Sequence, residues 1–63
     1  MTSHPLPKIS APAARALEGA GIATLEQAST YGEAALLDLH GFGPKGIMIL
    51  RAALTELGLE LAD

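Results

Sequence analysis

The sequence predicts an all-α fold, a compact bundle of four to five short helices. The chain has 63 residues, which is too short for more than one domain. It contains 12 alanines and 11 leucines but no valine and only four isoleucines, a composition that favours helix over strand. We therefore expect a flexible N-terminal lead-in over residues 1–5, followed by a single domain over residues 6–63.

The first helix is expected to follow an extended segment. Two prolines keep residues 1–8 out of a helix. Ser10 is a suitable N-cap, and the run over residues 11–18 has a proline in its first turn, where the missing N–H costs nothing. Gly19 then ends this helix.

A second helix is indicated by a capping box. Thr24 and Gln27 stand three residues apart, which is the spacing at which the two side chains cap each other's backbone N–H groups. The helix should run to about Thr30, with Leu25 and Ala28 facing inward.

A third, short helix should open at Gly32 and end at Gly41. Its apolar side would be supplied by three leucines: Leu36, Leu37 and Leu39.

The longest helix is predicted to begin at Pro44 and to end before Gly58. Apolar residues recur in it at spacings of 3, 4 and 3, as one buried helical stripe requires. The members of this stripe are Ile47, Leu50, Leu54 and Leu57. In the tail, Leu59 and Leu61 should lie on the core.

An offset of 33 residues repeats the apolar pattern of the chain. The matched pairs are Leu6 and Leu39, Ile9 and Phe42, Ala14 and Ile47, Leu17 and Leu50, and Ala20 and Ala53. In both copies a turn leads into a helix that has a proline in its first turn, so the common unit is a turn that feeds a helix N-terminus.

The turn of the second copy is the best candidate for chemistry. Gly41 and Gly43 flank Phe42, which should plug the core. The amides of Lys45 and Gly46 would point outward at the positive end of the helix dipole, where an anion is the natural ligand. Lys45 adds a positive charge, and Gly46 has no side chain to block a phosphate.

This turn, Gly-Phe-Gly-Pro-Lys-Gly, resembles the helix-hairpin-helix motif. Over residues 6–61 the order of elements is similar to the C-terminal domain of the bacterial RNA polymerase alpha subunit, a SAM-like fold. The resemblance implies two pseudo-repeated helix-hairpin-helix units that hold DNA through its backbone, while other faces meet transcription activators. It places Gly41, Gly43, Lys45 and Gly46 in the second hairpin.

The first hairpin departs from this pattern. Where the family tends to carry an arginine that reaches DNA, the chain has small residues and a proline over residues 10–13. The nearest cation is Arg15, one turn later, so the first hairpin is expected to contribute little.

Our first functional hypothesis is a module that binds the backbone of double-stranded DNA weakly and without sequence preference. Its phosphate-binding residues would be Gly41, Gly43, Lys45 and Gly46, assisted by Lys8 and Arg15. With four basic side chains, the slope of log affinity against log salt should not exceed about −4, and the affinity should fall in the nonspecific range of roughly 10⁻⁴–10⁻⁶ M. Such binding suggests a homo-oligomer or a larger assembly, one related to transcription.

The second hypothesis keeps the fold and changes the role. The net charge of −3 favours an acidic protein-interaction module, with a partner in the transcription machinery and a vestigial hairpin. The glycines would then only turn the chain, and Lys45 would be an ordinary solvated side chain. Arg51, at the margin of the buried stripe, is expected to pair with a nearby carboxylate.

The sequence contains no residue pattern typical of the other classes of function. No Ser/His/Asp order, paired-carboxylate motif or phosphate-binding glycine loop of the Walker type is present, so we expect no enzyme and no cofactor. His4 and His40 have no further ligands at metal-binding spacing. One tyrosine and one phenylalanine make no platform for single-stranded bases. No long apolar stretch or signal sequence occurs, which predicts a cytoplasmic protein without membrane contact.

Overall fold

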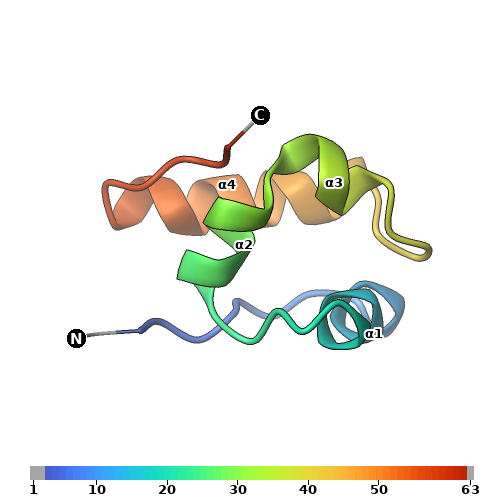
Figure 1. The fold of residues 1–63 in the computed structure, drawn as a ribbon. Helices are drawn as coiled ribbons and strands as arrows, with labels where there is room; N and C mark the ends of the chain where they lie inside the picture. The colour runs from blue at the N-terminus through green and yellow to red at the C-terminus, as the bar shows by residue number, and fades with distance from the viewer. Residues whose placement is uncertain (1–2, 63) are drawn as a thin grey trace.

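The computed structural model describes residues 3–62, and within them the chain forms four α-helices and no β-strand (Figure 1). The helices are α1 (Ala11–Gly19), α2 (Leu25–Tyr31), α3 (Glu33–Leu37) and α4 (Pro44–Glu56). An isolated antiparallel bridge joins Pro5 to Thr24. The prediction of a small all-α domain is confirmed. The first and last residues of each helix differ by at most a few positions from those expected.

Local capping explains where the first two helices begin. Ser10 is the N-cap of α1, and its side chain accepts a hydrogen bond from the N–H of Ala13 at 3.4 Å. Thr24 and Gln27 form the expected capping box at the start of α2. These side chains satisfy N–H groups that the helices themselves leave without acceptors.

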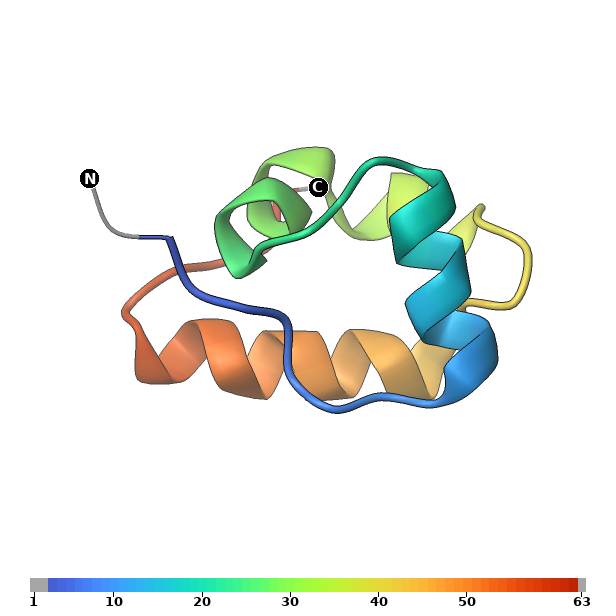
Figure 2. The ribbon, with the colours of Figure 1, turned by 90° about the horizontal axis from the view of Figure 1, so that it is seen from below.

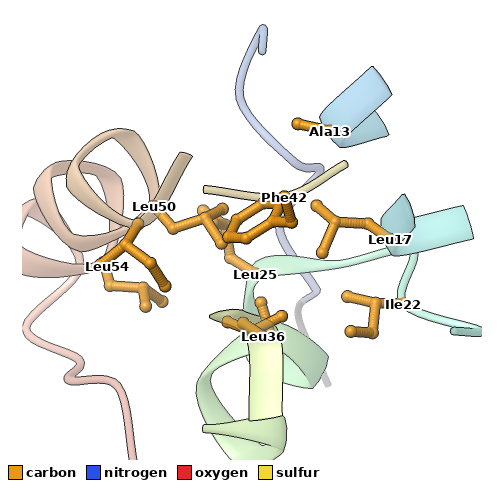
Figure 3. Packing of buried hydrophobic residues seen from close by; sticks show 10 residues of the cluster. Ala13, Leu17, Ile22, Leu25, Leu36, Phe42, Leu50 and Leu54 are labelled. Atoms are coloured by element: carbon orange, nitrogen blue, oxygen red, sulfur yellow. The ribbon is translucent and has the colours of Figure 1, made fainter. Parts of the chain in front are cut away.

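Phe42 lies at the centre of the core, between residues of α1 and residues of α4 (Figure 3). Four leucines around it are completely buried, one from α1, one from α3 and two from α4: Leu17, Leu36, Leu50 and Leu54. Leu25 and Ala28 of α2 are buried as expected. The core is therefore shared by all four helices, and the prediction that Phe42 plugs it is confirmed.

Two leucines predicted to face the core are exposed instead: Leu37 is 41% accessible and Leu57 is 37% accessible. Helix α3 ends at Leu37, before the Gly41 that the sequence pattern indicated as its end, so its second turn is not completed. Leu57 follows the last residue of α4, where the chain reverses at Gly58. Leu59 turns back instead, its N–H donating to the carbonyl of Leu54 at 2.8 Å.

The internal repeat is preserved at some positions and broken at others. Leu17 and Leu50 are both fully buried, as their equivalence predicts. Ala14 is exposed while its counterpart Ile47 is buried. The residues that cap α1 and α4, Ser10 and Gly43, are themselves 33 positions apart.

The two ends of the described chain pack against α2 (Figure 2). Residues 3–10 form an extended strap that crosses α4 on its way to α1. In the tail, the N–H of Ala62 donates to the carbonyl of Ser29 at 3.0 Å. The carbonyl of Ala62 accepts a hydrogen bond from the N–H of Glu33 at 2.7 Å. Leu59 and Leu61 are half-buried against the core, as predicted; Asp63 lies outside the described residues.

None of the helices formed by residues 3–62 combines the length and the apolar character that crossing a bilayer requires.

Candidate nucleic-acid interface

The hairpin between α3 and α4 packs directly on the first turn of α1. The N–H of Phe42 donates to the carbonyl of Leu39 at 3.1 Å and closes the turn. Gly41 adopts a φ of +89°, and a Cβ built on it would lie 3.2 Å from the carbonyl oxygen of Pro12. Any other residue at this position would be strained. Gly41 therefore shapes the hairpin and allows it to approach α1.

Gly46 has a packing role that the sequence did not reveal. It is buried in the first turn of α4, and a Cβ built on it would lie 2.8 Å from Cζ of Phe42. The missing side chain makes room for the phenyl ring. Only the backbone N–H of Gly46 is left as the group that a phosphate would contact.

The start of α4 has unused hydrogen-bond donors. Its N-cap, Gly43, has no side chain to accept a bond, and Pro44 has no N–H. The first amide with a helical acceptor is that of Ile47, which donates to the carbonyl of Gly43 at 3.2 Å. Within residues 3–62, the N–H groups of Lys45 and Gly46 have no acceptor. These two donors lie at the positive end of the α4 dipole.

The start of α1 differs, although it is the counterpart of α4 in the repeat. The Ser10 hydroxyl accepts the N–H of Ala13 and so occupies the place that a ligand would take. The Ala13 amide at the start of α1 is therefore occupied, whereas the corresponding amides at the start of α4 are not.

The N-termini of α1 and α4 lie near each other in the ribbon (Figure 2). Residues of both helix starts line a cleft of about 320 Å³. Lys8 of the strap and Lys45 of α4 both line it, and both are exposed. The remaining lining residues are Ile9, Ser10, Ala13, Gly46 and Ile49. Three of the predicted site residues, Lys8, Lys45 and Gly46, are thus brought together at one place.

The other predicted residues lie around the hairpin rather than in this cleft. Arg15 and Gly41 line a separate hollow of about 310 Å³, together with His40. Gly43 caps α4 without lining the cleft. Sequence reasoning considered His40 only as a metal ligand. Its position beside Arg15 depends on the packing of the hairpin on α1, for which the sequence carries no local signal.

The Lys and Arg side chains near the hairpin are not engaged in ion pairs within the described residues. Among the described residues, Arg51 is the one Lys or Arg side chain in an ion pair, with Glu33 of α3, which confirms the expected pairing. The Arg51 side chain is also well exposed. Lys8, Arg15 and Lys45 form no ion pair within residues 3–62.

A second ion pair, between His4 of the strap and Glu26 of α2, joins these two segments. The Glu26 carboxylate accepts a hydrogen bond from the backbone N–H of His4 at 2.9 Å and contacts Nδ1 of the His4 ring at 2.5 Å. These two bonds lower the pKa of Glu26 from its usual value of 4.5 to about 2. Because Glu26 stays ionised and can only accept, Nδ1 must carry a hydrogen.

In the part of the chain that the structure describes, no three potential metal ligands come together. Comparisons of the chain with protein-family models, with curated proteins and with solved structures find no match.

Proposed function

We propose that the protein is a small DNA-binding module that holds phosphates of double-stranded DNA in the cleft between the starts of α1 and α4. One observation supports this most strongly: Lys8 lines the same cleft as Lys45 and Gly46, the two residues whose amides are unused. A phosphate placed there would accept hydrogen bonds from the N–H groups of Lys45 and Gly46 and would face two ammonium groups.

The acidic net charge does not exclude such binding. Two of the seven carboxylates, Glu26 and Glu33, are already paired with His4 and Arg51. Backbone amides and the helix dipole attract an anion without contributing to the formal charge. No base-reading element enters the proposal, so binding would be independent of sequence.

The arrangement of α1 and α4 also supports the finer fold assignment. Two helices whose caps are 33 residues apart, each entered by a turn, fit a pair of pseudo-repeated helix-hairpin-helix units. On that assignment the module would act in transcription as part of a dimer or a larger assembly, where several weak contacts add up.

The decisive experiment is an NMR titration of labelled protein with a short DNA duplex at low salt. We expect chemical-shift changes at the amides of Lys8, Lys45 and Gly46, with weaker changes near Arg15. With three cations free of ion pairs, the slope of log affinity against log salt should not exceed about −2.7. Absence of shifts at millimolar DNA would refute the proposal.

Lys45→Gln should weaken DNA binding by about three- to tenfold, since one phosphate contact is lost. The matched control is Ala52→Glu, which gives the same net charge but changes an exposed position two turns later on α4. Equal weakening by both variants would show that only overall charge matters. In that case the acidic interaction module, which the net charge of −3 favours, becomes the better proposal.

A further inference from the structure

The strap that carries Lys8 is held to the start of α2 at two neighbouring residues: Pro5 forms the antiparallel bridge to Thr24, and His4 makes the hydrogen bonds. The N–H of Leu25 donates to the His4 carbonyl at 2.9 Å, and the N–H and ring of His4 both contact the carboxylate of Glu26. Leu25 and Glu26 are the first two residues of α2. The strap is therefore fastened to a helix that takes no part in the cleft.

Between this fastening and the N-cap of α1, the strap is held only by packing. Within residues 3–62, no hydrogen bond joins residues 6–9 to another element. Leu6 and Ile9 are half-buried against the core, and Lys8 is exposed. Pro7 is also half-buried, and a short extended segment held by packing alone is fixed less firmly than one whose two ends are both held.

Fixing the strap has a consequence at the cleft. Lys8 and Ile9 line it together with Lys45. A lysine that is already held beside a binding site loses less conformational entropy when an anion arrives than one on a loose segment. The position of Lys8 thus depends on what happens at the far end of the strap.

We propose that Glu26 is a positioning residue for phosphate binding: by holding His4, it fixes the strap that presents Lys8 to the cleft. This inference rests on the proposed function. The Glu26 carboxylate would thus contribute to anion binding without contacting the anion.

The inference is testable because it opposes simple electrostatics. Removing a negative charge from an acidic protein should strengthen DNA binding through weaker long-range repulsion. If Glu26 positions Lys8, Glu26→Ala should instead weaken the binding of a short DNA duplex, by about three- to tenfold, as Lys8→Ala does. Glu56→Ala, an equal charge change at an exposed position near the end of α4, should leave binding unchanged or slightly tighter.

The Lys8→Ala/Glu26→Ala double variant provides the second measurement. If Glu26 acts through Lys8, the double variant should bind no more weakly than Lys8→Ala alone, and both single variants should lower the salt slope by about 0.9. Backbone order over residues 6–9, measured by ¹⁵N relaxation, should fall in Glu26→Ala. Glu26→Gln keeps an acceptor for the His4 N–H and should restore part of the affinity.

The outcomes separate the two proposals. If Glu26→Ala binds as well as the natural chain while Lys8→Ala and Lys45→Gln bind weakly, the positioning role is overturned. The proposed function then still stands. No effect of Lys8→Ala or Lys45→Gln means that the proposed function itself fails. If circular dichroism shows that Glu26→Ala does not fold, His4→Ala, which removes only the ring contact, is measured in its place with the same expected loss.

Discussion

Gly46 and Phe42 occupy the most tightly packed point between the hairpin and α4. A Cβ on Gly46 would lie 2.8 Å from the phenyl ring, and the ring is buried among residues of α1 and α4. In an open helix interior, replacing glycine by alanine gains about 1 kcal/mol in helix propensity. Here the ring must move, so Gly46→Ala should lower the free energy of unfolding by about 1–3 kcal/mol.

Urea denaturation measures this change, and Gly19→Ala is its control. Gly19 ends α1 with nothing within 4 Å of its added Cβ, so the same substitution there should be neutral or stabilising by up to about 1 kcal/mol. A Gly46→Ala variant as stable as the natural chain would show that the ring of Phe42 can shift without cost.

The sequence could indicate only part of what these residues do. That Phe42 is buried followed from one large apolar residue between two glycines. That Gly46 makes room for its ring did not follow, because the contact joins the hairpin to the next helix and depends on the angle at which α4 leaves the turn.

At the level of the helices, the N-cap of α4 lacks the hydroxyl group that caps α1. Gly43 has extended backbone dihedrals that any residue can adopt, and nothing lies within 4 Å of an added Cβ. In Gly43→Ser, the hydroxyl can accept the N–H of Lys45 or Gly46. We expect a gain of a few tenths of a kcal/mol in stability together with weaker DNA binding, because the amides would no longer be available.

Thermal unfolding and a DNA titration on the same samples test this prediction. Gly43→Ala is the comparison: it has a similar size but accepts no hydrogen bond, so it should lose stability and weaken binding less than the serine. Unchanged or tighter binding by Gly43→Ser would show that the amides of α4 do not contact DNA.

The sequence predicted the helix starts and three of the four helix ends to within a residue, and only the end of α3 was misplaced. The N-cap Ser10 and the capping box of Thr24 and Gln27 are local chemistry, written within four residues of sequence. The end of α3 depends on where the chain must turn to cover the core. Leu37 at that end and Leu57, which follows α4, are both exposed against expectation. The cleft shared by Lys8 and Lys45 joins residues from opposite halves of the chain and could not be placed from local patterns.

For the molecule as a whole, the distribution of charge is more informative than its sum. Lys8 and Lys45 line the cleft where α1 and α4 begin, whereas Glu56 and Glu60 lie at and beyond the other end of α4. A helix of 13 residues separates these ends by about 20 Å, roughly twice the screening length at moderate salt. An anion approaching the cleft therefore experiences a local field that the net charge does not describe.

The contact between His4 and Glu26 makes the stability of the whole domain depend on pH. The pKa of Glu26 is lowered to about 2 in the folded chain, chiefly by the His4 backbone N–H. The unfolded chain binds the proton more readily, so the stabilisation is present above about pH 5 and is lost as the pH falls toward 2. The melting temperature should drop over this range.

Glu26→Gln removes this titration and serves as the comparison. Its melting temperature, followed by circular dichroism, should fall less between pH 5 and pH 2 than that of the natural chain. Parallel curves for the two proteins would mean that Glu26 does not contribute to the acid sensitivity of the fold.

The strap and the tail both reach α2, but their ends lie in different places (Figures 1 and 2). The first described residues lie at the end of the molecule opposite the hairpin, whereas the tail runs back toward the start of α3. A carrier protein, a dye or a surface tether attached at the N-terminal end would therefore leave the entrance to the cleft unobstructed, and the domain could hang from it and still present the same face to a ligand.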